Sequence, residues 1–322
     1  MEHMNILVTG GAGFIGSAVA KALMDRGDTP IIIDNFNDYY DPKLKRDRIS
    51  LFLGEYVGQF RLYEGDIRDR AFLDSVFETE KPEKIVHLAA MAGVRYSLER
   101  PELYADVNIM GTLNVLECAR KYGTTHLVYA SSSSVYGENA KVPFSESDPV
   151  DHPVSVYAAT KKATELLANV YGSVYGLKTT GLRFFTVYGP WGRPDMGVFK
   201  FVANIVDGKT IDLYNGGDMR RNFTYIDDIV SGTLVTLDAD LPVGSVMNIG
   251  GDQDEALSDY IAAVEKYAEK RAVTRMLPMQ QGDVTRTVAD ISKLRSLGWA
   301  PSTRIDDGVA RFVAWYREYN RI

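Results

Sequence analysis

The chain has 322 residues, 45% of them hydrophobic, and a formal net charge of −7. This length allows one large domain or two modest ones with a full core. The negative charge argues against non-specific binding to nucleic acid or membrane surfaces, and no apolar run approaches the roughly 20 residues of a membrane span. The single cysteine excludes an internal disulfide and suits the cytoplasm, and four histidines without metal-like spacing predict no metal site.

The first predicted element is a strand at Asn5–Thr9, followed by a glycine-rich turn and a helical pattern at Ser17–Arg26. Without side chains at Gly10, Gly13 and Gly16, the backbone and the helix N-terminus can approach a pyrophosphate. The spacing is G-x-x-G-x-x-G rather than the simplest fingerprint, G-x-G-x-x-G. The turn is therefore a candidate dinucleotide-binding loop.

A second predicted strand, Pro30–Ile33, is followed directly by Asp34. This carboxylate lies about 18 residues past Gly16, near the spacing of the acidic residue that bonds an adenosine ribose. A carboxylate there would repel a 2′-phosphate. The sequence therefore predicts NAD rather than NADP as the cofactor.

Strands and helices continue to alternate, with strands at 60–63 and 85–90 and helices at 71–78 and 102–122. This order predicts an α/β fold with a doubly wound parallel (Rossmann) sheet, whose ligands bind beyond the carboxyl ends of the strands. Residues at two such ends are predicted to contact the adenine and nicotinamide halves of the cofactor: Asp66, Ile67, Leu88, Ala89 and Ala90.

From Thr179 onward the alternation becomes irregular, and Gly/Pro-dense turns appear. We expect a smaller, discontinuous C-terminal substrate-binding lobe over the carboxyl edge of the main sheet. The expected division assigns 1–181 plus 222–251 to the Rossmann domain and 182–221 plus 252–322 to the lobe.

The helices near 102–122 and 157–175 carry more apolar surface than one sheet face needs. One face of each helix is expected to cover the sheet. A second, exposed face predicts a homodimer formed by helix packing.

The stretch from Ser131 to Lys161 contains candidate acid–base chemistry. A serine tract follows a buried strand at His126–Ala130, and Tyr157 and Lys161 lie one turn apart on the next helix. A tyrosine with a pKa near ~10 is a poor base at neutral pH. A nearby ammonium and a cationic cofactor favour the phenolate, and lowering the pKa by roughly 3 units requires about 4 kcal/mol.

Together these motifs resemble the extended short-chain dehydrogenase/reductase family, and within it the nucleotide-sugar epimerases. The resemblance spans essentially the whole chain and rests on Gly10–Gly16, Leu88–Ala90, the Ser132 region, Tyr157 with Lys161, and Phe223–Asp228. The chain is most similar to the UDP-glucuronate 4-epimerase type, through residues 91–97 and the Gly-Pro-Trp-Gly-Arg-Pro-Asp-Met segment at 189–196.

The resemblance implies a set of site residues. The catalytic residues are then Ser132, Tyr157 and Lys161. Those expected to hold NAD are Gly10, Gly13, Phe14, Ile15, Gly16, Asp34, Asn35, Asn37, Asp66, Ile67, Leu88, Ala89, Ala90, Tyr157 and Lys161. Those expected to hold the UDP-sugar are Arg95, Ser132, Ser133, Ser134, Thr186, Arg193, Tyr214, Arg221 and Arg286. The family's arginine before its distal Gly-Asp is missing at Gln280-Gln281-Gly282-Asp283, and Arg286 is the expected substitute.

The activity that the resemblance implies is NAD-dependent 4-epimerisation of UDP-glucuronate to UDP-galacturonate through a transient 4-keto sugar, without net redox change. Dehydratases of the family carry an Asp-Glu pair where this chain has Ser133 and Ser134. Hydroxyls cannot serve as that acid and base, so dehydration is disfavoured. UDP-glucuronate decarboxylase and a neutral UDP-hexose 4-epimerase stay open as alternatives. An NAD-sensing protein without chemistry is a further alternative, against which the intact trio argues.

A 4-keto uronic acid is a β-keto acid. It loses CO₂ when the bond from C5 to the carboxylate stands perpendicular to the plane of the C4 carbonyl. An epimerase must hold the carboxylate off that trajectory. Charge-assisted hydrogen bonds are the strong kind, and the candidates to provide them are Arg193, Thr186, Ser133 and Ser134.

Overall fold

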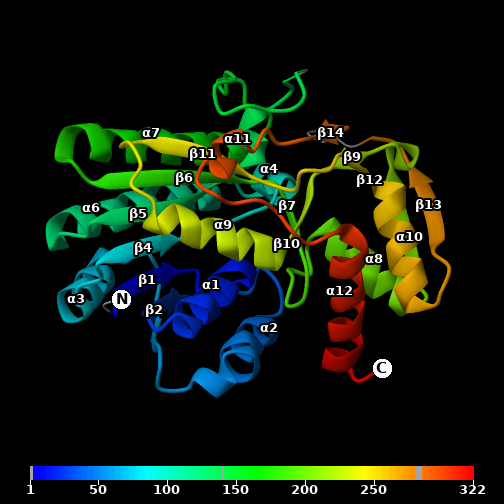
Figure 1. Ribbon diagram of the computed structural model, residues 1–322, viewed down its shortest axis with the longest axis horizontal. Helices are drawn as coiled ribbons and strands as arrows, with labels where there is room; N and C mark the ends of the chain where they lie inside the picture. Colours follow the sequence, from blue (N-terminus) through cyan, green and yellow to red (C-terminus); the bar gives the residue numbers. More distant parts are fainter. Residues whose placement is uncertain (1–2, 140, 280–284) are drawn as a thin grey trace.

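Figure 1 shows a computed structural model of the chain, which describes residues 3–139, 141–279 and 285–322. Its centre is a seven-stranded sheet in the order β11-β6-β5-β4-β1-β2-β3, and every neighbouring pair is parallel. The strands are β1 (Asn5–Thr9), β2 (Thr29–Asp34), β3 (Arg61–Glu64), β4 (Lys84–His87), β5 (His126–Ser132), β6 (Lys178–Phe184) and β11 (Ser245–Ile249). The predicted doubly wound parallel sheet is confirmed.

Helices cover both faces of this sheet. On one face α1 (Phe14–Asp25) packs against α9 (Ile226–Asp238). The other face carries α3 (Arg70–Glu80), α6 (Thr112–Tyr122) and α7 (Val156–Tyr175). Strand β1 serves both layers because successive side chains alternate between faces: Ile6 and Val8 join one buried cluster, and Leu7 joins the other.

Strand β1 lies between β2 and β4, so the chain leaves β1 toward one side of the sheet and returns on the other. The carboxyl ends of these strands border the crevice in which doubly wound folds bind ligands. The glycine-rich turn directly follows β1. The topology therefore places the predicted cofactor loop at the crevice.

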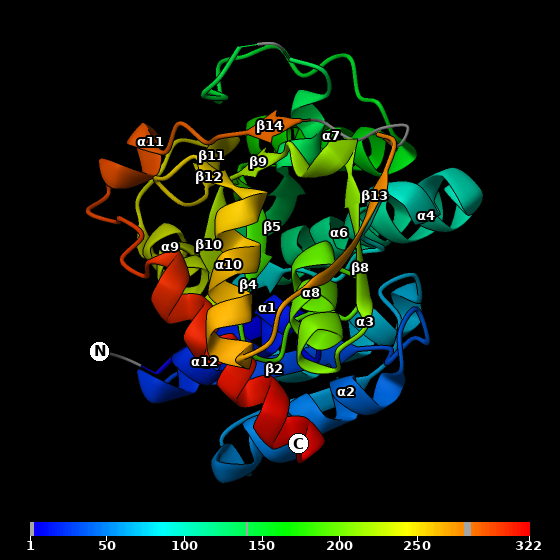
Figure 2. The ribbon, with the colours of Figure 1, turned by 90° about the vertical axis from the view of Figure 1, so that its right-hand side faces the viewer.

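Beyond β6 the chain builds smaller units beside the sheet. Three helices, α8 (Gly197–Val206), α10 (Leu257–Ala268) and α12 (Ile305–Asn320), pack against one another, as Figure 2 shows. The short strands are β7 (Thr186–Tyr188), β8 (Thr210–Tyr214), β9 (Arg220–Arg221), β10 (Phe223–Tyr225), β12 (Glu255–Ala256), β13 (Val273–Leu277) and β14 (Arg286–Thr287). The expected boundary at 181 falls inside β6, and the division into two units stays a prediction.

Two segments differ from the expected elements. The polar stretch after β2, in which no element was expected before the strand at 60–63, contains α2 (Pro42–Asp47) and a π-helical turn, η1 (Arg48–Phe52). The single helix expected over 102–122 is instead α5 (Pro101–Tyr104), a π-helical segment η3 (Ala105–Gly111) and α6. Within η3, Asn108 bonds both the N–H and the C=O of Met91 at 2.8 and 2.9 Å. These tertiary hydrogen bonds accompany the wider π-helical turn of η3. The spacing of apolar residues in the sequence does not predict them.

The remaining short helices connect these elements. They are η2 (Gly54–Tyr56), α4 (Val94–Glu99), η4 (Ser133–Tyr136), η5 (Asn215–Gly217) and α11 (Ser292–Arg295). Among the described residues, no helix combines the length and apolar character that crossing a bilayer requires.

Candidate active site

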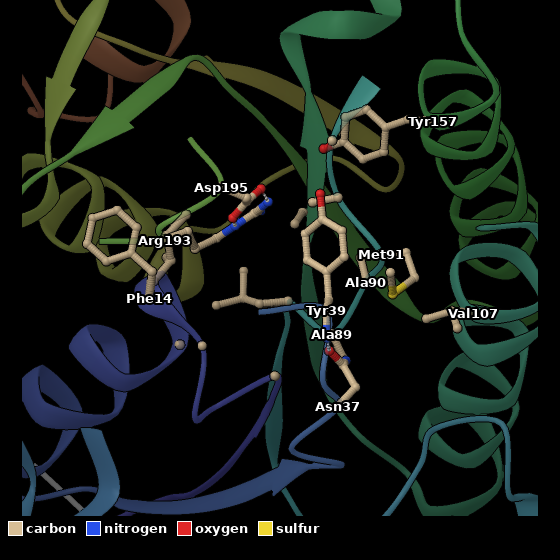
Figure 3. Close-up of a pocket in the computed structure, with 18 of the residues that line it drawn as sticks. Phe14, Asn37, Tyr39, Ala89, Ala90, Met91, Val107, Tyr157, Arg193 and Asp195 are labelled. Carbon is tan, nitrogen blue, oxygen red and sulfur yellow. Dashed lines mark hydrogen bonds and ion pairs between the residues drawn. The ribbon is translucent and has the colours of Figure 1, made fainter. Parts of the chain in front are cut away.

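A cavity of about 1110 Å³ lies at the carboxyl ends of the central strands. It reaches from the glycine-rich turn to the start of α7 and to the loop that carries Arg193 (Figure 3). Single small-molecule pockets measure roughly 300–1,000 Å³. The cavity is therefore large enough for more than one small ligand.

The glycine-rich turn closes tightly on itself. Gly10 has a φ of 69°, a conformation that L side chains rarely adopt. A Cβ atom on Gly16 would lie 2.2 Å from the Gly10 carbonyl oxygen, so α1 starts in direct contact with the turn. No side chain caps the N-terminus of α1 at Gly13. Its first N–H groups, at the positive end of the helix dipole, are thus available to a pyrophosphate.

Asp34 stands at the end of β2, beside this turn. Its carboxylate accepts hydrogen bonds from the N–H groups of Ala12 at 3.1 Å and Phe36 at 2.9 Å. Burial raises the pKa of Asp34, and the nearby charge of Lys45 opposes that rise. The Lys45 ammonium also donates to the carbonyl and side-chain oxygens of Asn37, both at 2.9 Å. The end of the cavity where the adenosine ribose is expected is thus lined by polar groups held in place by hydrogen bonds.

Asp66 forms the neighbouring wall after β3. Burial would raise its pKa, but hydrogen bonds from Arg68 and Asn35 outweigh that effect and hold it at about 2. Asn35 Nδ2 lies 2.9 Å from Asp66 Oδ2. Free helix N–H groups, a ribose-side carboxylate and this second carboxylate fit a dinucleotide such as NAD.

The acid–base residues come from β5 and α7. Ser155 caps α7 by accepting the Ala158 N–H at 3.1 Å, which fixes where the helix begins. Tyr157 then lies in the first turn, and its hydroxyl points into the cavity in Figure 3. Lys161, one turn later, donates to the Ala130 carbonyl at 2.8 Å. The predicted trio of Ser132, Tyr157 and Lys161 is thus assembled at one wall of the cavity.

Burial is the largest influence on both ionisable members of the trio. It raises the pKa of Tyr157, while a hydrogen bond with Ser132 and the charge of Arg193 lower it. It also lowers the pKa of Lys161, to about 8, and the charge of Arg193 acts in the same direction. Arg193, which the sequence reasoning had connected only with the substrate, is therefore one protein cation that favours the phenolate.

Arg193 and Asp195 form a fork-to-fork ion pair on the loop after β7 (Figure 3). The Arg193 Nε donates to Asp195 Oδ1 at 3.1 Å, and Nη2 donates to Oδ2 at 2.5 Å. Tyr39 bonds the same carboxylate, and burial together with the Asp195 charge raises the Tyr39 pKa to about 12. Asp195 therefore orients Arg193 through Nε and Nη2 and leaves Nη1 for another partner.

The predicted residues divide into two groups by position. All the cofactor residues, together with the three serines, Thr186 and Arg193, line the cavity. Four predicted substrate residues do not line it: Arg95, Tyr214, Arg221 and Arg286. The Arg95 guanidinium lies over the Tyr214 ring at 4.8 Å. Arg286 pairs with Asp254 at 2.6 Å, and Arg221 donates to the Thr285 carbonyl at 3.0 Å.

Contact of these four side chains with the substrate stays a prediction. The segment Gln280-Gln281-Gly282-Asp283, where the family's distal arginine is missing, lies outside the described residues.

Sequence reasoning missed several side chains that the fold brings to the cavity. Asp195 sits inside the segment that carried the family resemblance, so its two-residue spacing from Arg193 was an available signal. Tyr39, Lys45 and Arg68 lie outside the motifs named in the sequence analysis, and only the tertiary fold brings them to the cavity lining.

A family model described as GDP-mannose 4,6 dehydratase matches residues 7–312. A probable UDP-glucuronate 4-epimerase of Rhizobium meliloti is 46% identical, over 99% of this chain and 98% of that protein. The chain belongs to the extended short-chain dehydrogenase/reductase family of nucleotide-sugar epimerases. UDP-glucuronate 4-epimerase 4 of Arabidopsis thaliana is 47% identical to it, over 98% of this chain and 76% of that protein.

Solved structures of epimerases in this family share the fold. The UDP-glucuronic acid 4-epimerase of Bacillus cereus, in complex with UDP-glucuronic acid and NAD, superposes with a TM-score of 0.91 at 33% identity, over 98% of this chain and 100% of that chain. The UDP-glucose 4-epimerase of Thermus thermophilus, in complex with NAD, gives 0.88 at 31% identity, over 98% and 99% of the two chains. The predicted family and fold class are confirmed.

Proposed function

We propose that this protein interconverts UDP-glucuronate and UDP-galacturonate as an NAD-dependent 4-epimerase. The observation that carries the proposal is that Tyr157 and Arg193 face one cavity, beside a dinucleotide loop, in a chain related over its full length to UDP-glucuronate 4-epimerases. A base and a carboxylate-binding cation at one site suit oxidation at C4 of a uronic acid.

The side chains divide the proton chemistry among them. Tyr157, as phenolate, takes the proton of the C4 hydroxyl, and Ser132 is its hydrogen-bond partner or relay. Lys161, fixed on the Ala130 carbonyl, contributes a positive charge near the phenol and would hold the nicotinamide ribose of the cofactor. Bound NAD would supply the hydride acceptor for C4 and then the hydride donor to the opposite face of the turned keto sugar.

Arg193 restrains the carboxylate during the keto stage. Its Nη1 is not engaged by Asp195, so a sugar carboxylate can bond there while Asp195 keeps the guanidinium oriented. Thr186, Ser133 and Ser134 supply further hydroxyls on the same cavity. Ser133 and Ser134 hold the positions of the dehydratases' acid and base, so these two positions offer the keto sugar hydroxyls instead of the carboxyl groups that remove water.

The test is chemical and uses the purified full-length protein. We expect NAD to be released on acid denaturation, and NMR to show UDP-glucuronate and UDP-galacturonate equilibrating from either side without added cofactor. UDP-glucose and UDP-xylose are tested in parallel. A pentose nucleotide as main product, or turnover of the neutral sugar alone, would contradict the proposal.

We also propose a homodimer built on α7 and the segment before and within α6. Large apolar side chains stand exposed here: Leu166 is 56% exposed, Val170 46% and Val174 65%, and Met110 on η3 is 49% exposed. The three on α7 recur every four residues and share one face. A face of this kind favours helix packing against a second copy.

The dimer can be tested by light scattering after gel filtration. The wild-type protein is expected at twice its protomer mass of 35.8 kDa, and Leu166→Glu at one protomer mass, because a buried unpaired charge is costly. Val273→Glu is the matched control, since Val273 is 55% exposed on β13, away from this face. A monomeric wild type, or a dimeric Leu166→Glu, would refute the interface.

Two further assignments remain proposals. The main sheet with its helices and the segments around α8, α10 and α12 are treated as two units with the boundaries expected from the sequence. The protein is assigned to the cytoplasm because its single cysteine, Cys118, is free and buried. The dinucleotide is expected to bind in the first unit and the UDP-sugar between the two.

A further inference from the structure

Arg48 is a fully buried arginine that the chemistry above does not use. It opens the π-helical turn η1, and its relative exposure is 0%. Arginine is rarely buried completely unless its hydrogen-bonding groups are satisfied. Its bonding partners therefore show what holds it there.

All five N–H groups of the Arg48 guanidinium find acceptors. Nε and Nη2 donate to the Trp191 carbonyl at 3.0 and 2.7 Å, and Nη2 also donates to the Gly192 carbonyl at 3.1 Å. Nη1 donates to the Ala12 carbonyl at 3.1 Å and to the Tyr40 hydroxyl at 2.7 Å. Five donors in a rigid plane are the full capacity of arginine, which no other side chain matches.

The three backbone acceptors belong to the two halves of the active site. Ala12 lies inside the glycine-rich turn that is expected to hold the pyrophosphate, whereas Trp191 and Gly192 directly precede Arg193. One guanidinium thus bonds the cofactor loop and the carboxylate-binding loop at once, across 143 residues of sequence. A shift of either loop relative to the other would break bonds at Arg48.

The bonded backbone is also strained. Trp191 has a φ of 62°, in the left-handed region that a bulky side chain rarely adopts. Strained residues persist where the surroundings over-determine them, and such residues cluster at functional sites. Here the two Arg48 bonds to the Trp191 carbonyl join ring contacts with Phe52, Trp315 and Tyr319 at 5.6, 5.3 and 5.3 Å.

We propose that Arg48 is a positioning residue that couples the dinucleotide loop to the Arg193 loop, so that the sugar carboxylate is held in register with the nicotinamide. The proposal rests on the proposed function. It gives a reason why the enzyme releases UDP-galacturonate rather than a decarboxylated UDP-pentose. When the keto sugar is displaced from the nicotinamide, its C5–carboxylate bond can turn perpendicular to the plane of the C4 carbonyl. In that orientation the sugar loses CO₂. Bond rupture at Arg48 therefore increases decarboxylation as well as slowing epimerisation.

The variants are Arg48→Lys, which keeps the charge but has one nitrogen, and Arg48→Met, which keeps the apolar stem. Arg46→Met is the matched control, because Arg46 lies on the same segment, is half-exposed and pairs with Glu64. Arg48→Met is expected to lower kcat for UDP-glucuronate up to roughly 100-fold, as misplacement by about 1 Å can do, with a smaller change in KM. The ratio of UDP-pentose to UDP-galacturonate should rise, and bound NAD should be lost faster on dilution.

The product ratio is independent of the folded fraction, so loss of stability alone does not change it. If Arg48→Met does not fold, Arg48→Lys decides the matter, since one ammonium cannot reach both loops. A folded variant with the wild-type product ratio and wild-type NAD retention would overturn the coupling. Wild-type protein that makes no UDP-galacturonate would instead refute the proposed function, and NAD retention would then decide the role of Arg48.

Discussion

We expect Tyr157→Phe to bind NAD and UDP-glucuronate normally and to lower kcat roughly 100- to 10,000-fold, the range for loss of a general acid–base group. Phenylalanine keeps the ring that contacts Tyr104 edge-on at 6.2 Å and removes only the hydroxyl oxygen. The cavity keeps its shape. The C4 proton, however, has no acceptor of matched geometry.

The size of this effect follows from the surroundings of the phenol. Burial alone raises the pKa of Tyr157, and the Ser132 hydrogen bond and the Arg193 charge pull it back. A water molecule in place of the hydroxyl would lack both the fixed position and this tuned field. The lost rate is therefore expected in kcat, while KM changes little.

Single-turnover absorbance at 340 nm and steady-state NMR measure the two aspects of this prediction. Tyr267→Phe is the control, because its hydroxyl bonds Asp306 at 2.5 Å and it lies outside the cavity lining. Tyr157→Phe with wild-type kcat would remove Tyr157 from the chemistry. A raised KM with unchanged kcat would make it a binding residue only.

The parts of the site predictable from the sequence are those built by neighbours along the chain. The turn from Gly10 to Gly16 directly joins β1 to α1, and Tyr157 and Lys161 share one helix face. A short continuous apolar run located β1 to the residue, because the strands of a parallel sheet are buried on both faces. Local spacing and local geometry are sufficient for such elements.

Contacts between distant segments could not be predicted in this way. Arg48 and the Trp191 carbonyl are 143 residues apart, and a polar stretch gives no sign that its arginine is fully buried. The Arg95–Tyr214 pair joins α4 to β8, which needs the packing of the whole chain. The π-helical segment η3 could not be predicted for the same reason, since its Asn108 forms hydrogen bonds with Met91 and Thr160, which are distant in the sequence.

Arg193→Ala is expected to change what the enzyme makes as well as how fast. A hydrogen bond to a charged group contributes about 1.5–3 kcal/mol, so kcat/KM for UDP-glucuronate should fall roughly 10- to 150-fold. Without the cation the carboxylate of the keto sugar is free to turn. A larger share of turnovers should then end as decarboxylated UDP-pentose.

Asp195 increases the expected effect of removing Arg193. It bonds Nε and Nη2 of Arg193, whose side chain is only 23% exposed. In Arg193→Ala the Asp195 carboxylate remains and repels a substrate carboxylate in the same space. Arg193→Lys keeps a charge for Asp195 but cannot present a second fork. It is therefore expected to lie between wild type and Arg193→Ala in rate and in product ratio.

The pH profile separates this role from a purely steric one. Arg193 lowers the pKa of Tyr157, so its removal should raise that pKa and move the acid limb of the kcat profile to higher pH. Arg311→Ala is the control, since Arg311 is 57% exposed and faces Asp227 outside the cavity. Unchanged kinetics, an unshifted acid limb and no pentose product in Arg193→Ala would together leave the carboxylate restraint to the hydroxyls of Ser133, Ser134 and Thr186.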